Sequence, residues 1–178
     1  MYMDIYIKLA KDTIREYLVS GEIIDVPDYI PIEVLEKRAG VFICFKTNSK
    51  LRGCIGTFRP TRMNLAQEII QNTISAATED NRFMPVTADE VAELKVTIDI
   101  LSEPVLINDE EINQLDCKKF GVVVKSEDGI RTGLLLPDLD DVNSVEEQIS
   151  IACQKAGIDH YTENFSVYKF TVDRHEEK

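Results

Sequence analysis

Two side chains with complementary chemistry stand two residues apart in the stretch SKLRGCIGTFRP, residues 49–60. Side chains at positions i and i+2 of a strand share a face, so Arg52 and Cys54 are expected to lie side by side. A neighbouring guanidinium favours the thiolate and lowers the pKa of a cysteine. The pattern therefore predicts either an activated nucleophile or a patch that recognises anions.

The glycines on either side of Cys54 need a reason, because glycine weakens a strand. Gly53 and Gly56 leave space over the backbone, into which a ligand or another segment of the chain could fit. We therefore treat both as candidate ligand-binding residues. For Cys54 itself two simpler interpretations stay open: a small residue buried where two layers touch, or a residue that lines a ligand without reacting.

A cysteine nucleophile needs a base, and the sequence offers few. The only histidines are His160, which follows a predicted helix, and His175, which lies in the polar tail. A Cys–His pair therefore receives little support. Asp80 and Asp99 are the alternative bases, and either could instead orient the arginine at position 52.

Each of the remaining polar candidates has a structural interpretation beside its functional one. Asp80 and Arg82 could form an ion pair that closes the loop after a helix. Asp99, on the polar face of its strand, could simply be solvated. Arg131 is a candidate second anion contact, although a surface arginine beside a packing glycine, Gly133, explains the same residues. The candidate catalytic set is therefore Cys54, Arg52 and Asp80, and the candidate ligand-binding set is Gly53, Gly56, Arg82, Asp99 and Arg131.

Composition excludes several function classes. The 178 residues carry 20 Lys and Arg against 32 Asp and Glu, a net charge of −12, which is unsuited to binding phosphates, so nucleic acid is not expected as a partner. No apolar run approaches the roughly 20 residues that span a bilayer. The N-terminus has no long apolar segment typical of a signal peptide, so we expect a cytoplasmic protein. Neither histidines nor carboxylates have a metal-ligand spacing, so no metal is expected, and no cofactor is identified.

The four cysteines, at positions 44, 54, 117 and 153, form no CxxC pair and match no zinc motif. Disulfides are rare in cytosolic proteins, so none is expected here. Cys44 and Cys153 stand in apolar, periodic surroundings typical of small buried hydrophobes.

Hydrophobic periodicity predicts strands that come in hairpins with helices between them. Long helices are expected at 4–19, 64–79 and 144–158, short ones at 87–94 and 109–115, and strands at 40–47, 51–58, 95–101, 119–126, 130–137 and 165–172. Residues 22–33 are predicted to be an extended connection and residues 173–178 a frayed tail. This order is typical of an α+β fold with a mainly antiparallel sheet.

Several stretches resemble, in order, the AMMECR-type domain family, whose bacterial and archaeal members are called AmmeMemoRadiSam system protein A. They are LRGCIGTFRP, EDNRFMPVTADEVAELKVTIDIL, GIRTGLLLPDL, ACQKAGI and YKF. The resemblance implies an α+β fold with a mainly antiparallel sheet flanked by helices, a smaller subdomain packed beside it, and the motif facing a groove between them. We expect one such domain over residues 1–178, with a weak internal boundary near 80–118.

The resemblance also implies partners, although the family has no established reaction. Many members are encoded beside a Memo-like protein and a radical-SAM protein, and some bacterial members are fused behind a Memo-like domain. This sequence is most similar to the fused type. The expected function is a step in a modification pathway with these partners, through a groove site at Arg52, Gly53, Cys54, Ile55 and Gly56. The alternative is a non-catalytic module that binds a protein or an anionic ligand. The family usually has a proline where this chain has Asn81, which predicts a less rigid loop.

Overall fold

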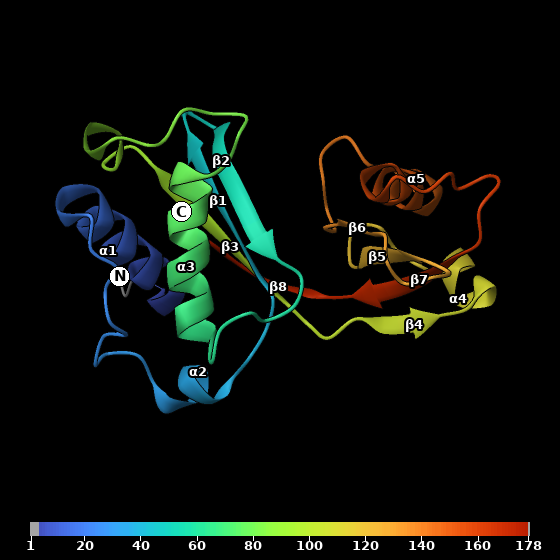
Figure 1. The fold of residues 1–178 in the computed structure, drawn as a ribbon, viewed down its shortest axis with the longest axis horizontal. Helices are drawn as coiled ribbons and strands as arrows, with labels where there is room; N and C mark the ends of the chain where they lie inside the picture. Colours follow the sequence, from blue (N-terminus) through green and yellow to red (C-terminus); the bar gives the residue numbers. More distant parts are fainter. Residues whose placement is uncertain (1–3, 178) are drawn as a thin grey trace. The chain divides into compact units, whose positions relative to one another are not determined.

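Two four-stranded sheets organise the chain, and each has its own core (Figure 1). The computed structural model describes residues 4–177. Residues up to Ile100 and from Asp173 onward form the first unit, and Leu101–Val172 form the second. The described pairings within the sheets are antiparallel, so the predicted α+β class with antiparallel sheets flanked by helices is confirmed.

The first unit contains the predicted motif, on an edge strand. Its sheet has the strand order β2-β1-β3-β8. Its elements are α1 (Ile5–Ser20), α2 (Ile32–Glu36), β1 (Val41–Thr47), β2 (Lys50–Thr57), α3 (Leu65–Thr78), the 3₁₀ helix η1 (Ala88–Glu90), β3 (Lys95–Leu101) and β8 (Val172–Glu176).

The core of this unit lies between the sheet and the helices α1 and α3. In β1 the residues Val41, Ile43 and Phe45 are fully buried and alternate with the half-buried Phe42 and Cys44. Because successive side chains of a strand point to opposite faces, the first set faces the helices and the second set faces away from them. The face of this sheet that points away from α1 and α3 therefore carries the first cysteine.

The predicted ends of α1 and the predicted start of α3 are confirmed. The Asp4 side chain accepts hydrogen bonds from the backbone N–H groups of Tyr6 and Ile7, which would otherwise lack partners. Gly21 ends α1 in the left-handed conformation, with φ of 77°. The Asn64 side chain caps α3 by accepting from the N–H of Gln67.

The second unit is a smaller sheet covered by one long helix. Its strand order is β4-β7-β5-β6. Its elements are β4 (Val105–Ile107), α4 (Asp109–Asn113), β5 (Gly121–Ser126), β6 (Thr132–Leu135), α5 (Val145–Ala156) and β7 (Phe165–Phe170). Gly133 is needed where α5 packs on β6, because a Cβ there would collide with the carbonyl oxygen of Ala152.

Three local predictions are wrong, and one short strand is not predicted. The tail does not fray within the described residues: residues 172–176 form β8, because Arg174 pairs with Asp99 and His175 contacts Asp4, and Lys178 lies outside the described residues. The connection at 22–33 is not wholly extended, since α2 begins at Ile32. β4 was not expected, and only η1 forms within 87–94. Short elements of this kind are held by tertiary contacts, which periodicity does not report.

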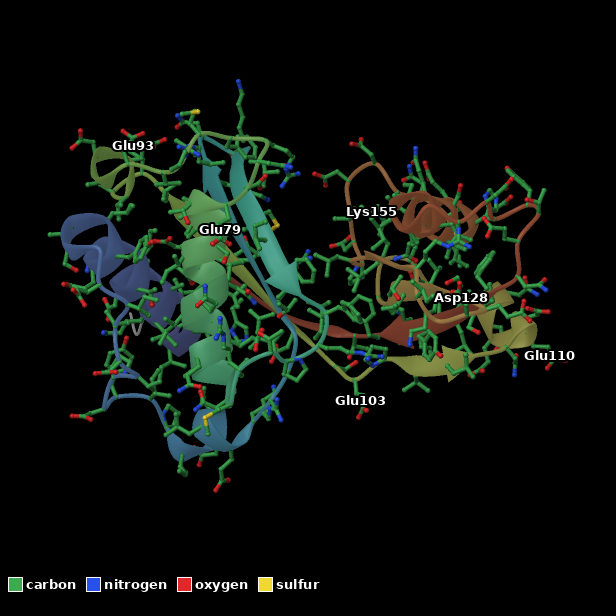
Figure 2. All side chains as sticks on the ribbon, viewed as in Figure 1. Glu79, Glu93, Glu103, Glu110, Asp128 and Lys155 are labelled. Carbon is green, nitrogen blue, oxygen red and sulfur yellow. A yellow bond between two sulfur atoms is a disulfide. The ribbon has the colours of Figure 1, made fainter. Side chains whose placement is uncertain are left out.

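The acidic side chains are spread over both units rather than gathered at one place. Glu79 and Glu93 lie on the first unit, and Glu103, Glu110 and Asp128 on the second (Figure 2). All five are exposed. They are therefore solvated surface groups.

Candidate functional site

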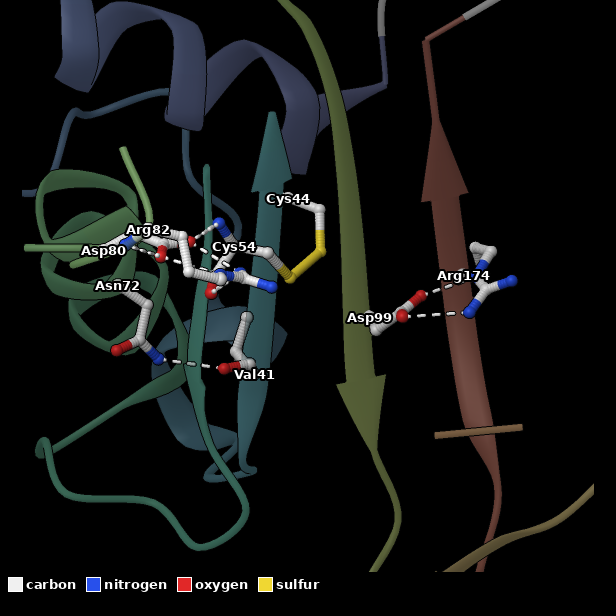
Figure 3. Close-up of a disulfide and its surroundings, with 8 residues drawn as sticks. All are labelled: Val41, Cys44, Cys54, Asn72, Asp80, Arg82, Asp99 and Arg174. Carbon is white, nitrogen blue, oxygen red and sulfur yellow. Dashed lines mark hydrogen bonds and ion pairs between the residues drawn. A yellow bond between two sulfur atoms is a disulfide. The ribbon is translucent and has the colours of Figure 1, made fainter. Parts of the chain in front are cut away.

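A disulfide joins Cys44 of β1 to Cys54 of β2 (Figure 3). The two residues are directly opposite each other in the strand register, with their Cα atoms 4.1 Å apart. The prediction that no cysteine would be paired is therefore wrong. The sequence separation of 10 residues reveals nothing by itself; the pairing follows from the hairpin register.

A β-bulge sets that register. Phe45 pairs with Gly53 and Lys46 pairs with Leu51, so Arg52 is the extra residue and has no partner in β1. The bulge interrupts strand alternation between Arg52 and Cys54. The rule that residues i and i+2 share a face, on which their expected proximity depends, therefore does not apply to this pair.

Asp80 and Arg82 occupy the free edge of β2. The N–H of Cys54 donates to Oδ2 of Asp80 at 2.8 Å, and Nη2 of Arg82 donates to the Cys54 carbonyl oxygen at 3.4 Å (Figure 3). The Cys54 N–H therefore points away from β1, which makes Cys44 and Cys54 a non-hydrogen-bonded pair. Such pairs bring opposing side chains closest together.

Asp80 is buried and surrounded by donors. Besides Cys54, its carboxylate accepts from the backbone N–H, Nε and Nη2 of Arg82, the last two at 2.9 and 2.6 Å. The Arg82 guanidinium is the main cause that holds the pKa of Asp80 well below its usual range, aided by the Cys54 N–H. A carboxylate held ionised so firmly is a weak proton acceptor near neutral pH. The geometry favours the structural ion pair over a catalytic base.

Arg52 is fully engaged with the segment that follows α3. Its Nε and Nη2 donate to the two carboxylate oxygens of Glu90 at 2.7 and 2.9 Å, and Nη1 donates to the Met84 carbonyl at 2.9 Å. The ion pair with Arg52 lowers the pKa of Glu90 to about 2. Arg52 thus anchors residues 84–90, and Glu90 neutralises the charge that was expected to activate Cys54.

The chain itself fills the space beside the motif glycines. A Cβ on Gly53 would collide with the carbonyl oxygen of Ala76 in α3. A Cβ on Gly56 would collide with the Phe42 ring and the Val41 carbonyl oxygen. Of the two alternatives for these glycines, close approach by another chain segment is the one observed.

Asp99 is buried, which corrects the interpretation of a solvated carboxylate. It lies on β3 and accepts from Nε and Nη2 of Arg174 on β8, at 2.7 and 3.0 Å (Figure 3). The two-pronged pair compensates the cost of burying the charge. It joins the neighbouring strands β3 and β8.

Arg131 belongs to the second unit and is paired there. Its Nη1 donates to the Gly157 carbonyl oxygen at 2.5 Å, and it forms an ion pair with Glu163. That pair lowers the pKa of Glu163 to about 2. The arginine ties the end of α5 to the segment before β7, which leaves its role as an anion contact a prediction.

The two remaining cysteines differ from Cys54 in pairing and in burial. Cys117 and Cys153 are unpaired and buried. Burial raises the pKa of the Cys153 thiol to about 11, so it stays protonated at neutral pH. Among residues 4–177, no three side chains of His, Cys, Asp or Glu are placed to hold a metal ion.

Sequence reasoning missed two residues of this site, Cys44 and Glu90. Both lie in predicted elements, but their roles depend on the bulge and on the path of the loop after α3. The signal that could have found Cys44 is its place on the strand that pairs with the motif strand. Glu90 had one signal, the capping box that it forms with Thr87.

Fold and motif together define a class of two-unit α+β domains with a Leu-Arg-Gly-Cys-Ile-Gly edge strand. The family model AMMECR1 matches residues 7–175, and the chain belongs to this family. A protein from Thermotoga maritima is 47% identical over 171 residues, covering 96% of each chain. A Clostridium acetobutylicum protein is 45% identical over 175 residues, which are 98% of this chain and 36% of the relative.

A solved structure supports the fold. The uncharacterised protein PH0010 from Pyrococcus horikoshii superimposes with a TM-score of 0.86 at 32% identity, covering 97% of this chain and 90% of that chain. Within residues 4–177, no helix is both long and apolar enough to cross a bilayer.

Proposed function

We propose that this domain acts in a cytoplasmic modification pathway with Memo-like and radical-SAM proteins. We also propose that its activity depends on the thiol of Cys54, which we call its working group. The observation that supports the proposal is which partners the side chains of the motif contact. Arg52 is held by Glu90 and two backbone carbonyls, and Asp80 by Arg82. The Cys54 sulfur instead lies on the face of the sheet that points away from α1 and α3, where its partner is another cysteine.

The partners are inferred from the resemblance, and one relative bears on their arrangement. The chain matches only 36% of the clostridial protein's length, so a domain of this type also occurs inside a longer chain. We propose that this domain works next to a Memo-like domain, whether in one chain or as separate proteins.

A deletion strain of the source organism tests this function. Its modified proteins, RNAs and small metabolites are profiled by mass spectrometry beside strains that lack the Memo-like or the radical-SAM protein. We expect one product to be missing from all three strains, and to return with the wild-type domain but not with Cys54→Ala. Recovery with Cys54→Ala would show that Cys54 is not the working group. If the three strains lacked three different products, the shared pathway would be contradicted.

The second candidate function is a non-catalytic module that binds a partner protein. Met84 favours it, because this apolar residue is 81% exposed on the segment that Arg52 anchors. An anionic ligand is less well supported, because Arg52 and Arg131 already have carboxylate partners. Under this function Met84→Glu abolishes binding of the Memo-like protein in calorimetry, whereas Cys54→Ser leaves it unchanged. The reverse pattern would contradict the module.

A further inference from the structure

We infer that Cys44 and Cys54 form a reversible dithiol–disulfide couple that exchanges with thiols and disulfides from outside the domain. The inference rests on the proposed function, since it names the chemistry of the same site. The class of reactant is a thiol or a disulfide, carried by a small molecule or by another protein.

The strands, and not the bond, bring the two sulfurs together. β1 and β2 are paired from Val41–Thr57 to Thr47–Lys50, and the hairpin closes through Asn48 and Ser49. In the folded protein the ladder on both sides of this pair keeps the two residues opposite each other, so the bond is not needed to hold them there. Reduction leaves two thiols in place, ready to re-form the bond without unfolding.

The couple also differs from the other cysteines in access. Cys44 and Cys54 are both half-buried, on the face of the sheet away from α1 and α3. Cys117 and Cys153 are buried in the second unit. Thiol–disulfide exchange requires that a thiolate reach a sulfur, which selects the first pair.

The position of β2 at the sheet edge assigns the order of attack. A thiolate attacks one sulfur from the side opposite the leaving sulfur. For Cys54 that side is the outer edge of the sheet, where β2 pairs with no further described strand and where Asp80 and Arg82 contact the Cys54 backbone. For Cys44 that side is above β3, where Thr97 is the directly opposite residue. The Cys54 sulfur is therefore the one that an external thiolate attacks. The Cys44 thiol is the one that displaces the external group from Cys54 when the disulfide re-forms.

The exchange balances without a cofactor. An external thiolate RS⁻ bonds to Sγ of Cys54, the Sγ–Sγ bond breaks, and Cys44 leaves as a thiolate that takes up a proton. A second external thiolate attacks the sulfur of R in the mixed disulfide and releases Cys54 as a thiolate. In sum the protein disulfide and two RSH give the protein dithiol and RSSR, a two-electron reduction of the protein. The reverse reaction oxidises the dithiol.

In the proposed cytoplasmic setting the dithiol is the resting form, because glutathione and thioredoxin keep thiols reduced there. The disulfide then forms only during a reaction or under oxidation. Such transient behaviour is typical of catalytic and redox-sensing disulfides in that compartment.

The experiment compares Cys44→Ser and Cys54→Ser in the folded full chain. Each is incubated with oxidised glutathione, and peptide mapping locates the mixed disulfide. We expect Cys54 in the first variant to react about tenfold or more faster than Cys44 in the second, because access governs the rate. Cys153→Ala is the matched control and should keep the wild-type rate of reduction by glutathione. A second arm uses a thioredoxin that lacks its resolving cysteine, so that reaction in that arm alone identifies a protein thiol as the reactant.

Equal rates in the two serine variants would overturn the assignment of Cys54. Failure of the wild-type chain to form the disulfide with oxidised glutathione while folded would overturn the couple itself, as would reduction only after unfolding. The proposed function fails separately, because complementation by Cys54→Ala is measured without reference to the disulfide.

Discussion

Cys44 lies opposite Cys54 because Arg52 is the extra residue of a bulge in β2. Without the register shift between Phe45 and Lys46, the residue opposite Cys44 would be Gly53. One irregular residue thus does two things: it brings two thiols together, and its own side chain holds residues 84–90 through Glu90. Bulges next to functional sites commonly redirect side chains in this way.

Gly53→Ala should destabilise the first unit, because the added Cβ would meet the carbonyl oxygen of Ala76 in α3. Overpacking of this kind costs about 2 kcal/mol in the free energy of unfolding. Urea denaturation measures it, with Lys50→Ala on the exposed end of the same strand as control. If the two variants prove equally stable, close packing is not the reason for glycine at position 53.

Arg52→Lys should loosen residues 84–90. A lysine cannot make the two-pronged contact with Glu90 and also reach the Met84 carbonyl. We expect faster hydrogen exchange at the backbone amides of 84–90, with a global loss of about 1 kcal/mol in unfolding free energy. Arg59→Lys, at an exposed position just after the same strand, is the control. Unchanged protection in Arg52→Lys would mean that other contacts hold the segment.

Asp80→Asn should change the acid stability of the protein. The folded-state pKa of Asp80 lies below the value of about 3.9 for an unfolded aspartate, so its ion pair stabilises the folded protein fully above that pH. That contribution is lost as the pH falls toward the folded-state pKa. We expect the variant to be less stable by about 2 kcal/mol at pH 7, and to lose less stability than the wild type between about pH 5 and 3. Parallel pH curves from urea titrations would contradict the role of Asp80.

Much of the fold follows from the sequence. The apolar run in 40–47, the alternation in 95–101, and caps such as Asp4 and Asn64 are local signals with a direct physical cause, and the structure confirms them. The site is harder to predict from the sequence, because its geometry depends on Arg52, which has no partner in β1. Nothing in LRGCIG distinguishes a regular strand from one with a bulge at Arg52, and the pairing of the cysteines changes with that choice. The ion pair of Asp99 does not follow from local sequence for a similar reason, since its partner Arg174 lies 75 residues away.

Arg174→Met should destabilise the first unit by about 3 kcal/mol, because it leaves the buried Asp99 carboxylate without its guanidinium. Adding Asp99→Asn should restore part of that loss, since the remaining side chain is uncharged. Thermal unfolding of the two single variants and the double variant forms a cycle that measures the coupling. Additive losses would indicate that the two side chains do not depend on each other.

The central claim is that the motif cysteine works through its partner across the hairpin. The most direct measurement is peptide mapping of the native wild-type chain under non-reducing conditions, before and after treatment with oxidised glutathione and then with dithiothreitol. The account predicts one cross-linked peptide pair containing Cys44 and Cys54, formed by the oxidant and removed by the reductant, with an unchanged circular dichroism spectrum throughout. Four thiols that stay free after oxidation, or a cross-link that involves Cys117 or Cys153, would contradict it.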